Sequence, residues 1–261
     1  MGAGIAHAFL LCGSDVTIVE SGAEAARAAQ GRVEQSLAKA VERGFTGVPG
    51  RLSVTTVAEE LADAELVVEA VPELLDLKRE ILERIARVAP GAAIGSNTSS
   101  IPITTLAQGL ADPARLIGLH FFNPVPASEL VEIVVGRQTA AELVTRAQGW
   151  VAGLGKTGVT VADSPGFASS RLGVMLALEA MRMLEEGVAS AEDIDTAMTL
   201  GYRHPVGPLR TTDIVGLDVR LDIADALAKE LGPRFEPPAL LREKVERGEL
   251  GRKSGRGFYA W

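Results

Sequence analysis

In the first half of the chain, short runs of β-branched residues alternate with longer stretches in which apolar residues recur at helical spacing. This alternation is typical of parallel βαβ units. We expect strands at Val16–Glu20, Leu52–Thr55, Leu66–Val71, Ala92–Ser96, Leu116–Phe121, Leu130–Val135 and Val159–Ala162. Helices are expected at Gly2–Gly13, Gly22–Gly44, Leu77–Ala89 and Ala140–Leu154. The consecutive apolar residues Leu66, Val67 and Val68 indicate a strand covered on both faces, as the central strands of a parallel sheet are.

The segment Asp163-Ser164-Pro165-Gly166 interrupts this pattern, and no strand is expected after it. The second half predicts helices at Phe167–Glu186, Ala191–Leu200, Pro208–Leu231 and Ala239–Glu246. The pattern therefore predicts an α/β domain with a doubly wound sheet in residues 1–162 and an all-helical domain in residues 163–261. The first helix of the second domain is apolar nearly all the way round, which is typical of a helix buried in a core or between subunits.

Composition excludes several classes of protein. The 261 residues are 47% hydrophobic and carry a net charge of −8, which argues against nucleic acid or an anionic membrane surface as the main partner. The single cysteine, Cys12, cannot form an intramolecular disulfide, and three histidines are too few and too scattered for a metal site. No apolar run is long enough to span a membrane and no signal peptide is visible, so we expect a cytoplasmic protein.

The chain opens on residues that are similar to the second half of a dinucleotide-binding βαβ unit. Gly2 and Gly4 begin a helix whose backbone N–H groups can face a pyrophosphate, and Glu20 ends the following β-branched run, eighteen positions after Gly2. An acid at that position accepts hydrogen bonds from ribose hydroxyls and favours NAD over NADP. The alternative is an ordinary glycine-rich helix start with a surface glutamate, because the first strand and the first two glycines of such a unit are not in the chain.

A second candidate site lies in two expected strands on either side of a turn. If the turn centres on Pro126, His120 and Glu132 lie opposite each other in a hairpin, since each is six positions from it. A carboxylate beside an imidazole fixes its tautomer and stabilises the imidazolium, which suits a general base near neutral pH. The alternative is a strand-end histidine with an unrelated glutamate.

Six short motifs, in this order and at this spacing, give the chain a resemblance to a known family. They are Glu69-Ala70-Val71-Pro72-Glu73, Ser96-Asn97-Thr98-Ser99-Ser100, His120-Phe121-Phe122-Asn123-Pro124, Asp163-Ser164-Pro165-Gly166-Phe167, Glu192-Asp193-Ile194-Asp195 and Lys253-Ser254-Gly255-Arg256-Gly257-Phe258-Tyr259. The sequence resembles the 3-hydroxyacyl-CoA dehydrogenases, particularly the bacterial 3-hydroxybutyryl-CoA dehydrogenases, over essentially its whole length. The resemblance implies a Rossmann-type domain that binds NAD, followed by a helical domain through which two copies form a homodimer.

The resemblance also implies a reaction, the NAD-dependent oxidation of a short-chain (3S)-3-hydroxyacyl-CoA to the 3-oxoacyl-CoA. His120 would take the hydroxyl proton while the hydride leaves for the nicotinamide, Glu132 would support His120, and Ser99 would hydrogen-bond the reacting oxygen. Ser99 is alternatively a helix N-cap. Asn97 is expected to shape its turn or to touch the cofactor rather than to react.

Other residues are assigned to the cofactor and to coenzyme A. Glu73 and Lys78 match cofactor-side positions of the family, although a solvated helix start explains them almost as well. Ser36, Lys39 and Arg43 share the polar face of the second expected helix, where the family binds CoA phosphates and where a merely solvated face is the commoner explanation.

One position departs from the family pattern. Ser170 stands where the family usually has an asparagine near the substrate, and its shorter side chain has one donor instead of two. This difference leaves three alternatives to an ordinary enzyme of the family. They are reduced turnover, a different substrate such as a small 3-hydroxy acid or carnitine, and a non-catalytic protein. The missing first strand would leave two central sheet edges unpaired, so we also expect low stability and weak NAD binding.

Overall fold

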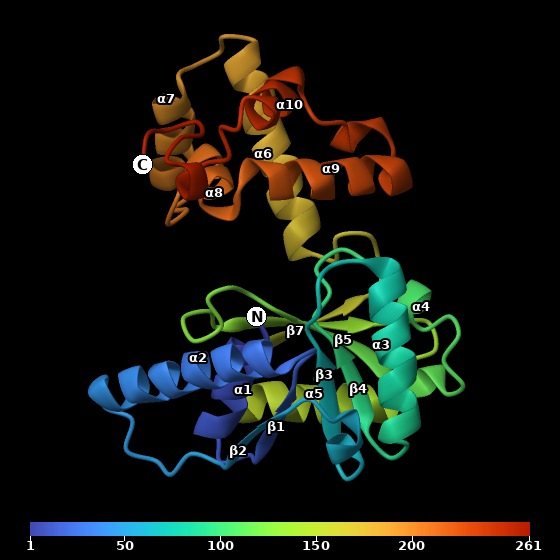
Figure 1. The fold of residues 1–261 in the computed structure, drawn as a ribbon. Helices are drawn as coiled ribbons and strands as arrows, with labels where there is room; N and C mark the ends of the chain where they lie inside the picture. The colour runs from blue at the N-terminus through green and yellow to red at the C-terminus, as the bar shows by residue number, and fades with distance from the viewer. The chain divides into compact units, whose positions relative to one another are not determined.

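The computed structural model describes residues 1–261, which form two compact units, Met1–Ser164 and Pro165–Trp261 (Figure 1). The predicted boundary lay two residues earlier, between 162 and 163. No helix combines the length and the apolar character that crossing a membrane requires.

The first unit is an α/β structure. Its helices are α1 (Gly2–Leu11), α2 (Ala23–Glu42), α3 (Leu75–Val88), α4 (Ile103–Leu106) and α5 (Ala141–Gly153), with short 3₁₀ turns at Ala58–Leu61 and Pro113–Arg115. Its strands are β1 (Val16–Val19), β2 (Leu52–Thr55), β3 (Leu66–Glu69), β4 (Ala93–Ser96), β5 (Leu116–Phe121), β6 (Leu130–Val135) and β7 (Thr157–Ala162). All seven predicted strands are present, and the short helix α4 was not expected.

The strands form two sheets. β1 pairs with β2, and the other five strands follow the order β3-β4-β5-β6-β7. Every neighbouring pair is parallel except β5 and β6, which are antiparallel. No ladder joins β1 to β3, so β3 is an edge strand and Leu66 and Val68 are only half-buried. The expectation that this strand is central and covered on both faces was therefore wrong.

The two faces of β5 contact different helices because successive side chains of a strand point to opposite sides. Ile117, Leu119 and Phe121 pack in a core with residues of α1 and α5. His120 belongs to the other alternating set together with Gly118, whose missing side chain leaves room for Ile103 of α4, since a Cβ there would lie 3.0 Å from the Ile103 Cδ1. The side chain of His120 therefore points to the α4 face of the sheet.

The second unit is helical. It contains α6 (Ser169–Glu185), α7 (Ala191–Thr196), α8 (Pro208–Val215), α9 (Leu217–Leu231) and α10 (Ala239–Glu246), with short turns at Ala197–Gly201, Pro233–Phe235 and Arg252–Ser254. The single helix predicted over residues 208–231 was wrong, because Gly216 adopts a φ of 110° and separates α8 from α9. Buried apolar residues of α6, α8, α9 and α10 form one core, to which Val174, Leu209 and Leu227 belong.

The carboxy-terminal motif is held by one buried aspartate of α8. The carboxylate of Asp213 accepts hydrogen bonds from the backbone N–H groups of Phe258 and Tyr259 and from the indole N–H of Trp261, at 2.8 to 2.9 Å. The Tyr259 hydroxyl donates to Asp195, which also accepts from the first turn of α8. These contacts explain the last of the six motifs as a structural closure of the second unit.

Candidate active site

The carboxyl ends of β3, β4 and β5 meet at one edge of the five-stranded sheet because these strands are parallel. Glu69, Ser96 and Phe121 are the last residues of these strands. The amino end of α1 lies there too, since a Cβ on Gly2 would be 3.9 Å from that of Ala70. In open α/β sheets, ligands bind beyond the carboxyl ends of the strands.

His120 and Glu132 form a buried pair at this edge. The antiparallel register of β5 and β6 places them directly opposite each other, which confirms the hairpin prediction. The His120 Nδ1 lies 2.8 Å from the Glu132 Oε2, and the residues are 6% and 1% exposed. The Phe122 ring, with its centre 4.5 Å from that of the imidazole, adds a second contact.

This geometry assigns different tasks to the two ring nitrogens. A carboxylate at Nδ1 favours the tautomer in which Nδ1 carries the proton and donates it to Glu132, so Nε2 carries the lone pair. The ring can therefore accept a proton at Nε2, and the buried carboxylate stabilises the imidazolium that results. The pair has the arrangement of a general base with an orienting acid.

Glu73 organises the loop that follows β4. Its Oε1 accepts hydrogen bonds from the Thr98 hydroxyl at 2.6 Å, from the Ser99 N–H at 2.8 Å and from the Ser100 N–H at 2.9 Å. Burial alone would raise the pKa of Glu73, but these donors and the Lys78 ammonium hold the pKa below its usual value. The carboxylate therefore fixes the backbone that carries Ser99.

Ser99 is not a helix N-cap. Its hydroxyl makes only a long contact, 3.3 Å, to the Glu73 Oε1. Helix α4 begins after Pro102, and the carboxylate of Asp163 accepts from its first N–H groups, at 3.0 Å from Ile103 and 2.7 Å from Thr104. The hydroxyl of Ser99 can thus turn to another acceptor at small cost, since Glu73 keeps its shorter contacts.

Two fully buried charged residues support Glu73 from beneath. Glu69 and Lys78 have side chains that are 0% and 1% exposed, and the Lys78 Nζ lies 2.7 Å from the Glu69 Oε1 and 3.2 Å from the Glu73 Oε2. The sequence singled out Glu73 and Lys78 but assigned nothing to Glu69. A signal was present, because an acid ends an apolar strand nine positions before a lysine.

Asn97 joins the ends of two strands. Its Oδ1 accepts a hydrogen bond from the Phe121 N–H at 2.9 Å, and its own N–H donates to the Glu69 carbonyl. Asn97 therefore shapes the turn after β4, and its contact with the cofactor stays a prediction.

The amino end of α1 fits the phosphate groups of a dinucleotide. The helix has no side-chain cap and no acid in its first turn, so the N–H groups of Gly2 and Ala3 have no partner in the chain. Such N–H groups and the helix dipole favour an anion. Glu20 follows β1, is half-exposed and makes no side-chain hydrogen bond, so its carboxylate is available to ribose hydroxyls.

The remaining sequence-predicted residues lie on or next to two helices, α2 and α6. Lys39 and Arg43 are exposed on and just after α2, whereas Ser36 is half-buried and donates its hydroxyl hydrogen to the Arg32 carbonyl. Ser170 lies in the first turn of α6, in the second unit.

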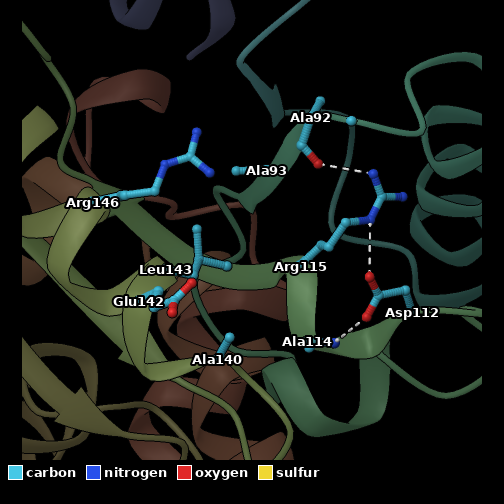
Figure 2. A pocket seen from close by; sticks show the side chains of 10 residues that line it. Ala92, Ala93, Asp112, Ala114, Arg115, Ala140, Glu142, Leu143 and Arg146 are labelled. Atoms are coloured by element: carbon cyan, nitrogen blue, oxygen red, sulfur yellow. Dashed lines mark hydrogen bonds and ion pairs between the residues drawn. The ribbon is translucent and has the colours of Figure 1, made fainter.

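A cavity of about 220 Å³ lies at the opposite, amino-terminal edge of the sheet (Figure 2). Arg115 lines it, but its guanidinium is engaged by Asp112 and by the carbonyls of Ala89, Pro90 and Ala92, which follow the end of α3. The arginine therefore closes a helix end, and this cavity is not the candidate site.

Comparison with known proteins agrees with the order of the motifs. The family model described as 3-hydroxyacyl-CoA dehydrogenase, NAD binding domain, matches residues 1–164, and that of the C-terminal domain matches residues 166–261. A probable 3-hydroxybutyryl-CoA dehydrogenase of Deinococcus radiodurans is 41% identical, over 100% of this chain and 96% of its own length. A 3-hydroxybutyryl-CoA dehydrogenase of Mycobacterium tuberculosis is 42% identical, over 100% and 95% respectively.

Solved structures give the same result. The (S)-3-hydroxybutyryl-CoA dehydrogenase PaaH1 of Ralstonia eutropha superposes with a TM-score of 0.95 at 38% identity, covering 100% of this chain and 95% of that one. FadB2 of M. tuberculosis gives a TM-score of 0.94 at 42% identity with the same coverage. The chain belongs to the 3-hydroxyacyl-CoA dehydrogenase family.

Proposed function

We propose that the chain oxidises a short-chain (3S)-3-hydroxyacyl-CoA to the 3-oxoacyl-CoA with NAD. The observation that carries this proposal is the buried His120–Glu132 pair at the carboxyl edge of the sheet, beside an uncapped helix start. The names of the relatives and the NAD-binding family of the first unit support the same reaction.

Each step of the proposed reaction is assigned to a residue of the chain. The Nε2 of His120 accepts the proton of the C3 hydroxyl as the C3–O bond becomes a carbonyl, and Glu132 stabilises the imidazolium. Ser99 donates a hydrogen bond to the reacting oxygen. NAD, when bound, accepts the hydride that leaves C3. In the reverse direction His120 returns its proton to the oxygen.

Cofactor binding is assigned to three groups of the first unit. The N–H groups at Gly2 bind the pyrophosphate, Glu20 binds the ribose hydroxyls, and Glu73 and Asn97 shape the loop beside the nicotinamide. Glu20 would repel the 2′-phosphate of NADP, so the proposal includes a preference for NAD.

Coenzyme A and a second copy of the chain are the proposed partners. Lys39 and Arg43 are exposed cations that can pair with CoA phosphates, and Ser36 lies on the same helix. Association would involve the second unit, on which large apolar side chains are exposed, among them Leu172 at 71% and Leu200 at 78%. Sedimentation velocity tests this, and Leu172→Glu should favour the monomer if α6 takes part.

The decisive experiment is to follow NADH formation with (S)-3-hydroxybutyryl-CoA, its (R) enantiomer and free 3-hydroxybutyrate. We expect turnover with the (S)-thioester alone, and a kcat lowered by about 10²–10⁴-fold in His120→Gln. Turnover of free 3-hydroxybutyrate but not of the thioester would instead indicate a dehydrogenase of small hydroxy acids, which the serine at position 170 would then explain.

A further inference from the structure

Arg220 occupies a core position of α9. The buried residues of this helix share one face, and Arg220 is the one charged residue among them; they are Leu217, Arg220, Ala224 and Leu227. Arg220 is 9% exposed, although arginine is almost never so deeply buried unless it is paired. A cation at this position needs a physical reason, because removing a charge from water costs free energy.

No group of the chain balances this charge. The guanidinium of Arg220 makes no hydrogen bond and no ion pair, and its Nε is completely buried without an acceptor. Burial lowers the pKa of Arg220 and no carboxylate acts against that effect, although an arginine keeps its charge in a protein. Asp218, two positions earlier, pairs with Lys253 instead. The charge of Arg220 is therefore left for a partner that the chain does not supply.

The guanidinium of Arg220 faces the beginning of α6. Outside its own helix, a Cβ on Gly173 would have a single heavy atom within 4 Å, the Arg220 Nη1 at 3.6 Å. Ser170 lies one turn before Gly173 on the same face, is half-buried and makes no hydrogen bond. Of the unpaired nitrogens of Arg220 only Nε is fully buried, so the two terminal nitrogens remain accessible at this face.

The first turn of α6 favours an anion at the same place. It contains no acidic residue and no side-chain cap, and the helix continues for 17 residues. The dipole of such a helix attracts negative charge to its amino end. A carboxylate matches the planar fork of a guanidinium and also accepts from a serine hydroxyl. Arg220, Ser170 and the helix dipole thus favour one kind of ligand, a carboxylate.

We propose that Arg220 and the first turn of α6 at Ser170 bind a carboxylate of a ligand. This carboxylate can come from the far end of the substrate's acyl chain or from a free dicarboxylate. The first source rests on the proposed function and narrows its substrate class to (3S)-3-hydroxyacyl-CoA thioesters whose acyl chain ends in a carboxylate. Two experiments separate the sources.

The first experiment compares two six-carbon thioesters that differ only at the end of the acyl chain, (S)-3-hydroxyadipyl-CoA and (S)-3-hydroxyhexanoyl-CoA. We expect the wild type to have a kcat/KM at least about tenfold higher for the first, since hydrogen bonds to a charged group have effects of this size. Arg220→Met keeps a long side chain, removes the buried charge and should abolish the preference. The matched control is Lys229→Met, which removes one positive charge from the exposed side of α9 and should keep the preference.

The second experiment measures binding without turnover. Thermal unfolding of the full chain is followed with and without adipate at constant ionic strength. We expect adipate to raise the melting temperature of the wild type and of Lys229→Met, but not of Arg220→Met. Gly173→Asp places a carboxylate of the chain itself beside the Arg220 Nη1. This variant should melt at a higher temperature than the wild type without ligand and should no longer respond to adipate.

Each outcome assigns the carboxylate or refutes the site. A thioester preference that depends on Arg220 assigns it to the acyl chain. Stabilisation by adipate that depends on Arg220, without a thioester preference, assigns it to a free dicarboxylate. The absence of both effects, or their persistence in Arg220→Met, would overturn the proposal. A wild-type chain that oxidises neither thioester but responds to adipate through Arg220 would refute the proposed function alone.

Discussion

One hydrogen bond decides which nitrogen of His120 can react. Nδ1 faces the Glu132 carboxylate at 2.8 Å, and both residues are buried, so the charge of the imidazolium is balanced by a partner that water screens little. Removing either residue has different consequences. Without His120 the base is lost, whereas without the charge of Glu132 the ring remains but its preferred tautomer and the imidazolium lose their support.

At the residue scale we therefore expect His120→Ala to lower kcat by about 10²–10⁴-fold, the usual contribution of a positioned base, with little change in the Kd for NAD. Steady-state kinetics and calorimetry measure the two quantities. Glu132→Gln should have a similar or slightly smaller effect. A His120→Ala protein that kept most of its kcat would exclude this histidine as the base.

Position 170 allows a gain-of-function test. Ser170→Asn adds a second donor to a side chain in the first turn of α6, and one donor to a reacting oxygen can contribute up to about 10²-fold in rate. We expect kcat with (S)-3-hydroxybutyryl-CoA to rise. A neutral or harmful result would indicate a site built around serine and would favour a substrate other than this thioester.

At the scale of elements, single residues decide where helices begin and end. Helix α4 is only four residues long, and its first N–H groups are satisfied by Asp163, sixty positions away. One helix was expected from Pro208 to Leu231, but Gly216 with its φ of 110° ends α8 and starts α9. Helix ends are set here by a distant carboxylate and by one backbone conformation.

Substitution of Gly216 tests whether its backbone conformation is needed between α8 and α9. Gly216→Ala should lower the free energy of unfolding by about 1–3 kcal/mol, because an L residue is strained at this φ. Gly149→Ala is the matched control, since this glycine lies inside α5 where a Cβ meets nothing within 4 Å. The control should gain up to about 1 kcal/mol. Urea unfolding measures the free energy of unfolding of both variants. A change of the same sign in both would contradict the role given to Gly216.

At the scale of the whole molecule, an excess of acidic residues makes stability depend on pH. The chain carries 34 acidic and 26 basic residues, and carboxylates that are hydrogen-bonded in the folded state resist protonation. Glu73 is such a group, with a pKa held below the ordinary value of 4.5. A carboxyl with a lowered pKa stabilises the fold above its ordinary pKa and loses this contribution as pH falls through the folded value.

We therefore expect Glu73→Gln to lower the melting temperature most near neutral pH. The difference from the wild type should shrink as pH falls below about 4.5, because the wild-type carboxyl then also becomes neutral. Thermal unfolding of both proteins between pH 3 and pH 7 measures this, with ionic strength held constant. A difference that stays constant over the whole range would mean that the charge of Glu73 does not contribute to stability.

The sequence by itself determined the order of the seven strands, the division into an α/β and a helical unit, and the facing positions of His120 and Glu132. These features follow from local periodicity and from the length of one turn, which short stretches of chain contain. The tertiary structure alone decided that Glu69 and Lys78 lie buried beneath Glu73, that Asp163 caps α4, and that β3 is an edge strand. Each of these depends on groups that lie far apart along the chain or on a neighbour in the sheet, and only packing brings such groups together.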